Sequence, residues 1–175
     1  MRFIKSEDLK TGMRLARPIY NKNGVLLYER NSKLTLQGIN SVRNFGLLGI
    51  YILEPAEPVP PMTRADAEFE RFQTMCVFSI REELDVIADT GRTQRAQMIA
   101  SNIIKNYGHM DARINFLQNL RSKEDYIYKH SLNVAILCAM MTHVMNMKVE
   151  EQMETVQAAL VHDIGKIMRF EDEAA

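Results

Sequence analysis

The sequence has no long apolar run, little cysteine and no surplus of either charge. Its 22 basic side chains balance its 22 acidic ones, which argues against a protein whose task is to neutralise a nucleic-acid backbone. No stretch approaches the roughly 20 apolar residues needed to cross a bilayer, and the first eight residues lack the apolar stretch of a signal peptide. We therefore expect a cytoplasmic protein whose partner is neither a nucleic acid nor a membrane.

The two cysteines, Cys76 and Cys138, each lie alone in an apolar stretch. This pattern argues against a disulfide framework and against a zinc knuckle, and it favours two buried thiols. The chain is richer in methionine, with 12 residues in all. We interpret the methionines between residues 140 and 147 as core filler rather than as a partner surface.

The first 54 residues predict a β-rich N-terminal module. Residues 21–24 have the turn chemistry of a hairpin, and we expect a strand at 25–28 and others near 14–16 and 49–53. Thr35 can cap a helix that Gly46 ends.

A proline-rich segment follows this module. Four of the five prolines lie within residues 54–61. Since proline disfavours the helix and offers no amide donor, we assign residues 55–63 to a linker.

Every segment beyond the linker predicts a helix. Residues 64–122 are expected to form a helical connector, with a helix over 65–89 that Gly91 ends and another from about Thr93 to Gly108. The pattern also predicts a short helix that contains Ile114, Leu117 and Leu120.

Two longer helices are predicted to close the chain, over about 123–147 and from about 149 through Ile164. The periodicity of the first places four side chains on its inner face: Val134, Cys138, Met141 and Met145. The expected fold class is α+β, a small β-rich N-terminal module followed by an all-helical domain.

Three side chains in these last helices suggest a metal site. His130 lies near the start of the first long helix, and His162 and Asp163 lie near the end of the next. Two imidazoles and a carboxylate form a plausible ligand set for zinc, manganese or iron. Lys166 follows Asp163 by three residues on the same helix face, where it could hold an anionic phosphate.

The alternative interpretation is that these residues have a purely structural role. A histidine on an apolar helix face is more often a hydrogen-bonded core residue, and a His-Asp pair occurs by chance in many proteins. Asp163 lies among apolar residues, however, and a buried carboxylate needs a partner to offset its desolvation. Spacing and burial together leave both interpretations open.

Two segments carry a resemblance to a known family. Residues 130–135 (HSLNVA) and 158–167 (AALVHDIGKI), whose histidines are 32 positions apart, resemble the first two conserved blocks of the HD-GYP family, a branch of the HD phosphohydrolase superfamily. Residues 124–128 fit that family's approach to its first histidine. Residues 3–53 resemble a small module often found before HD-GYP domains in bacteria.

The resemblance implies an all-helical domain with a metal centre that hydrolyses cyclic di-GMP. His130, His162 and Asp163 would be metal ligands, with Asp163 bridging two ions of iron, manganese or zinc. Asp163 and Lys166 would be the catalytic residues, with Lys166 contacting the substrate phosphate. Some family members have a glutamate four residues before the first histidine that adds a third ion. That position is Tyr126 here, so two ions are expected.

The chain also departs from the family pattern. The remaining ligands and the Gly-Tyr-Pro motif of the family lie downstream of the His-Asp block, and this sequence stops at Ala175. We expect residues 123–175 to be the N-terminal part of an HD-GYP-type domain, without catalysis and with few or no metal ions in the isolated chain. The alternative function is a non-catalytic module that senses a ligand or forms a homodimer through exposed apolar helices.

Overall fold

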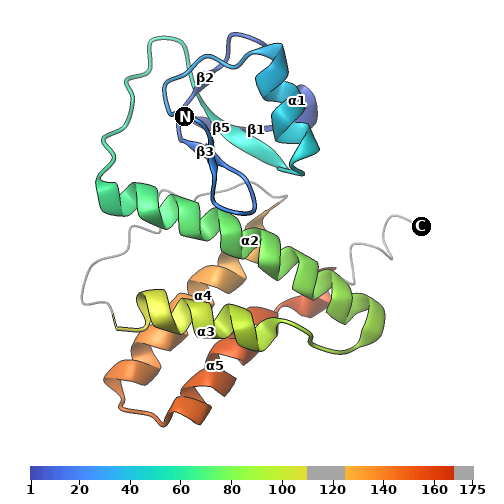
Figure 1. Cartoon of the computed structure of the whole chain (residues 1–175), viewed down its shortest axis with the longest axis vertical. Coiled ribbons are helices and arrows are strands. Elements are labelled where there is room, and N and C mark those ends of the chain that lie inside the picture. Colours follow the sequence, from blue (N-terminus) through green and yellow to red (C-terminus); the bar gives the residue numbers. More distant parts are fainter. Residues whose placement is uncertain (110–124, 168–175) are drawn as a thin grey trace. The chain divides into compact units, whose positions relative to one another are not determined.

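The structure, a computed structural model, describes residues 1–109 and 125–167. These residues separate into two compact units, one within residues 1–75 and one within residues 76–167. The first unit contains small sheets with one short helix and the first part of a long one, and the second is helical (Figure 1), which confirms the α+β class. The boundaries predicted at residues 54, 63 and 122 stay predictions. The predicted helix with Ile114, Leu117 and Leu120 lies outside the described residues.

The strands of the first unit form two antiparallel sheets. In the larger sheet, β5 (Gly49–Leu53) lies between β1 (Arg2–Lys5) and β2 (Arg14–Leu15). The second sheet is a hairpin at the predicted turn, β3 (Ile19–Tyr20) with β4 (Leu26–Tyr28). Its first strand was not predicted, and the strand that was expected near residues 14–16 pairs with β5 instead. The turn of the hairpin closes because the Asn21 side-chain oxygen accepts the backbone N–H groups of Asn23 and Val25, at 2.9 and 3.0 Å.

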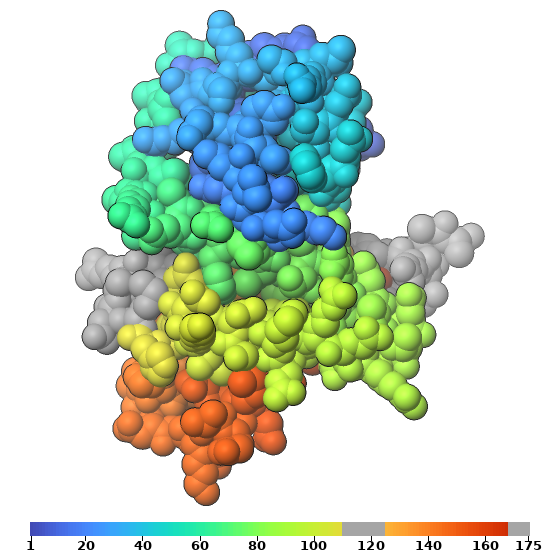
Figure 2. Space-filling view, in the orientation of Figure 1, coloured from blue at the N-terminus to red at the C-terminus, as the bar shows by residue number. Residues whose placement is uncertain are grey.

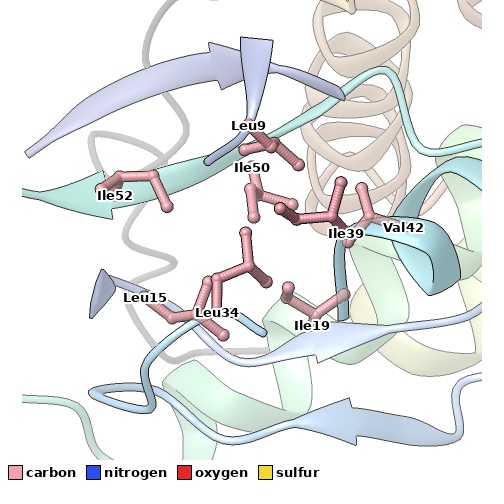
Figure 3. Packing of buried hydrophobic residues seen from close by; sticks show 8 residues of the cluster. All are labelled: Leu9, Leu15, Ile19, Leu34, Ile39, Val42, Ile50 and Ile52. Carbon is pink, nitrogen blue, oxygen red and sulfur yellow. The ribbon is translucent and has the colours of Figure 1, made fainter. Parts of the chain in front are cut away.

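The helix of this unit has the predicted ends. The Thr35 hydroxyl accepts the Gly38 N–H at 3.1 Å and so caps α1 (Leu36–Asn44). Gly46 ends the helix with a φ of 68°, a conformation that costs glycine little. Apolar side chains from the sheets, the loops and α1 form one core (Figure 3): Leu9, Leu15, Ile19, Leu34, Ile39, Val42, Ile50 and Ile52.

Long helices make up the rest of the described chain. They are α2 (Arg64–Thr90), α3 (Ala96–Tyr107), α4 (Tyr126–Val144) and α5 (Val149–Val161), of which the last three pack against one another. Gly91 ends α2 with a φ of 68°, as predicted. In the described part of the chain, no helix combines the length and the apolar character that a membrane span requires.

Helix α3 begins at Ala96 rather than at the predicted Thr93. The cause is Glu83 of α2, whose carboxylate accepts the backbone N–H groups of Gln94, Arg95 and Ala96 at 2.8, 2.8 and 3.1 Å. The residues before Ala96 are held by this long-range contact instead of entering the helix. A side chain distant in sequence therefore caps α3.

The predicted inner face of α4 was wrong. Met141 and Met145 are 61% and 67% exposed, and Val134 and Cys138 are partly exposed. The buried face consists of other residues: Ser131, Leu132, Ala135, Ile136, Ala139 and Thr142.

The small side chains of this face explain why it is the buried face of α4. Ala135 and Ala139 let α5 approach closely, and the Gln152 amide of α5 donates to the Ala139 carbonyl at 3.0 Å. Both cysteine thiols were predicted to be buried. Cys76 is buried, and its burial raises the pKa of its thiol to about 12. Cys138 is only partly buried, because it lies off the packed face of α4.

Candidate metal centre

The two helices α4 and α5 bring the predicted metal ligands together. His130 lies one turn into α4. Helix α5 ends at Val161, so His162 and Asp163 lie in a turn, and residues 164–167 are helical again. The prediction of one continuous helix through Ile164 was therefore wrong. Adjacent side chains on a helix point about 100° apart, yet Nε2 of His162 and Oδ2 of Asp163 at this turn lie 3.5 Å apart.

The carboxylate of Asp163 is the centre of this group. Its Oδ2 atom lies 3.6 Å from Nε2 of His130 and 3.5 Å from Nε2 of His162. One ligand atom from each of the three residues lies within 4.8 Å of the other two. The Asp163 side chain is 15% exposed, whereas His130 and His162 are about a third exposed, at 34% and 36%. An ion could therefore enter from solvent.

The orientation of His162 fits a metal ligand. Its Nδ1 lies 2.8 Å from the Ala159 carbonyl, which can only accept, so Nδ1 carries the proton. In the neutral ring Nε2 then presents a lone pair toward the Asp163 oxygen. Two acceptor atoms that face each other at 3.5 Å repel unless a metal ion between them or a proton on Nε2 removes the repulsion. A carbonyl that orients the ring in this way is the usual support of a ligating histidine.

The same Asp163 oxygen also contacts Lys166. The Lys166 ammonium donates to Oδ2 at 2.6 Å, from the short helical segment that follows the turn. This hydrogen bond is the largest cause that lowers the pKa of the Asp163 carboxyl, and the charge of Lys166 and those of the two imidazoles in their protonated forms lower it further. The carboxyl is therefore ionised at neutral pH, as a metal ligand must be.

Tyr126 occupies the position where some HD-GYP members carry a glutamate. Its ring is stacked on the His130 ring, with centroids 5.5 Å apart and planes 10° apart. The stacked phenol ring restrains the His130 ring, and it offers no carboxylate that could bind an ion. The number of ions that the site holds stays a prediction.

The structure thus places all the predicted site residues in one group: His130, His162, Asp163 and Lys166. Their roles as ligands and catalytic residues stay predictions. The sequence prediction missed the Ala159 carbonyl and the Tyr126 ring. The role of the Ala159 carbonyl could have been predicted, because carbonyl groups in the last turn of a helix lack intrahelical partners and are available to a nearby donor.

Comparison with known proteins agrees with this group. The family model described as HD domain matches residues 127–174. No curated protein and no solved structure matches the chain. The matched segment begins within α4 and includes His130, His162, Asp163 and Lys166. The chain therefore contains, at residues 127–174, an HD domain of the HD phosphohydrolase superfamily.

Proposed function

We propose that this HD domain is a metal-dependent phosphodiesterase of the HD-GYP type, with cyclic di-GMP as its substrate. The observation that carries the proposal is the convergence of His130, His162 and Lys166 on one oxygen of Asp163. The substrate is supported by the resemblance of residues 130–135 and 158–167 to HD-GYP blocks.

Each side chain has a distinct task in this proposal. His162 is held by Ala159 with its Nε2 toward the site, and His130 approaches Asp163 from the neighbouring helix. Asp163 supplies the negative charge and could bind one ion through each of its two oxygens. When bound, divalent ions make water a stronger nucleophile and neutralise charge that develops on a phosphate.

Lys166 would hold the substrate phosphate beside these ligands. Its side chain is 54% exposed, and among the described residues its ammonium is paired with Asp163. Metal binding to Asp163 would weaken that ion pair and leave the ammonium for a phosphate oxygen. An ammonium is a suitable partner because it is a compact charge with rotatable donors.

The test is turnover of cyclic di-GMP by the purified chain with Mn²⁺ or Fe²⁺, followed by chromatography of the linear dinucleotide and GMP. This assay also decides for or against the expectation, stated from the sequence, that the isolated chain is without catalysis. The proposed function predicts turnover in the wild type, none with His162→Ala, and a loss of about a hundredfold in kcat with Lys166→Ala, since it removes a donor to the transferred phosphate. Lys105→Ala, at an exposed position of α3, is the control and should retain wild-type turnover.

Two model substrates separate the diester activity from general phosphatase activity. Bis(p-nitrophenyl) phosphate should be hydrolysed faster than p-nitrophenyl phosphate. The proposal is contradicted if the metal-loaded chain does not cleave cyclic di-GMP, or if His162→Ala leaves turnover unchanged.

The alternative function, a homodimerising module, has one specific observation in its favour. Large apolar side chains are exposed along α4 and at the start of α5: Leu137, Met141, Val144, Met145 and Val149. The turn between these helices lies at the outer surface of the unit (Figure 2). Residues 131–142 contain no charged side chain, so two copies of the stripe would not repel each other in a symmetric pair.

Light scattering after size exclusion tests this alternative. If the stripe pairs two chains, the wild type is a dimer and Met141→Glu is a monomer, because the new carboxylate would be desolvated at the interface. Met98→Glu changes a methionine of α3 that is also exposed and should remain dimeric. A wild type that is monomeric at every soluble concentration would rule the alternative out.

A further inference from the structure

The other two histidines of the chain face each other outside the candidate metal centre. Nδ1 of His109 lies 3.1 Å from Nδ1 and 3.4 Å from Nε2 of His143. The rings are nearly perpendicular, with centroids 4.3 Å apart and an angle of 82° between their planes. The chain has four histidines, so each of them lies in one of two clusters.

The spacing of this pair matches that of two ligands on one ion. A divalent zinc ion binds imidazole nitrogen at about 2.0–2.1 Å. Two nitrogens 3.1 Å apart, each at that distance, subtend roughly 100° at the ion. This angle lies between the octahedral and tetrahedral values. Both rings are exposed, so they can rotate quickly to direct their lone pairs at a common point.

The electrostatic environment favours a cation at this place. His143 lies in the last turn of α4, and His109 follows the end of α3 by two residues. The free carbonyl groups at a helix C-terminus carry partial negative charge. A hydrogen bond between two imidazoles also needs one ring that is neutral, with a lone pair toward the other. An ion that replaces the shared proton would be bound by both rings.

The helices hold the two rings in position. Tyr107 of α3 and Thr142 of α4, each within two residues of a histidine of the pair, are buried, and α3 packs against α4. The Thr142 hydroxyl is further fixed by donating to the Cys138 carbonyl at 2.7 Å. The backbone positions of the pair are therefore set without a metal, which lowers the cost of assembling a site.

We propose that His109 and His143 form a second metal site, which binds one divalent ion of the zinc, nickel or copper class and joins the C-terminal ends of α3 and α4. These ions favour imidazole ligands. Water would fill the remaining coordination positions, because both rings face solvent. The site does not depend on the phosphodiesterase proposed above.

Calorimetric titration of the whole chain with zinc tests the proposal. We expect His143→Ala and His109→Ala each to lose the same single equivalent of bound zinc, while Asp163→Ala keeps it. If the wild type binds only one equivalent and His143→Ala removes it, the second site stands and the candidate metal centre does not bind zinc. Wild-type stoichiometry and affinity in both histidine variants would overturn the proposal.

A measurement on the wild-type chain tests the proposal even if a histidine variant does not fold. In ¹⁵N spectra of the histidine rings, zinc should shift the resonances of His109 and His143 together at one saturation point. Shifts confined to His130 and His162, or to one ring of the pair, would overturn the second site.

Discussion

Asp163→Ala is expected to abolish tight binding of Mn²⁺ at the candidate metal centre. The Asp163 Oδ2 atom is the one that both histidine nitrogens approach, at 3.6 and 3.5 Å. Its carboxylate is also the only negatively charged ligand of the three. Without it, two neutral imidazoles remain, and Mn²⁺ prefers oxygen ligands. We expect the Kd to rise more than about a hundredfold, since loss of a mere supporting partner already costs roughly 10–100-fold.

Calorimetry with Mn²⁺ measures this effect without interference from the histidine pair at His109 and His143. Asp163→Asn keeps the shape of the side chain without its charge and should give an intermediate affinity. Asp89→Ala removes an exposed carboxylate near the end of α2 and serves as the matched control. Wild-type affinity in Asp163→Ala would show that the ion binds elsewhere.

Glu83→Ala is expected to lower the free energy of unfolding by about 3 kcal/mol, because it removes three charged hydrogen bonds and leaves one buried and two part-buried backbone donors without this partner. The Glu83 residue is 3% exposed and accepts three backbone N–H groups at the start of α3. Its negative charge also lies at the positive end of the helix dipole. An ordinary helix cap contributes less, about 1 kcal/mol.

Urea unfolding followed by circular dichroism measures the loss. The neighbouring Glu82 is the matched control, because its contact with Arg95 is an ion pair between half-exposed side chains, at 2.9 Å. We expect Glu82→Ala to lower the free energy of unfolding by less than about 1 kcal/mol. Equal losses in the two variants would contradict the capping role of Glu83.

Local signals explain why much of the fold could be predicted. The Asn21 turn, the Thr35 cap and the glycines at 46 and 91 each act within a few residues, through a hydrogen bond or a backbone angle that their own side chain decides. The site residues could be predicted for a related reason. His130, His162 and Asp163 are chemically distinct from the apolar helices around them.

Contacts between distant segments account for the failures. Periodicity could not choose the buried face of α4, because nearly every side chain from Ser131 to Thr142 is small or apolar. The choice depends on the close approach of α5 at Ala139. The start of α3 depends in the same way on Glu83, which lies 13 residues before Ala96. A local sequence pattern predicts neither the contact of α5 with Ala139 nor the contact of Glu83 with the start of α3.

The turn at His162 is a third such case. A helix through Ile164 satisfies the sequence pattern, but the structure ends α5 at Val161 and bonds the Lys166 N–H to the Asp163 carbonyl at 2.9 Å. The new segment places Lys166 against the Asp163 carboxylate. The sequence predicted that these residues are neighbours, while the end of α5 at Val161 came from the structure.

Anomalous diffraction from crystals of the chain grown with Mn²⁺ tests the central claim most directly. The account predicts a peak at the manganese edge that is bonded to Nε2 of His130, Nε2 of His162 and the Asp163 carboxylate, at the distances usual for such ligands. An absence of any peak at these three residues, in crystals that contain manganese elsewhere, would contradict it.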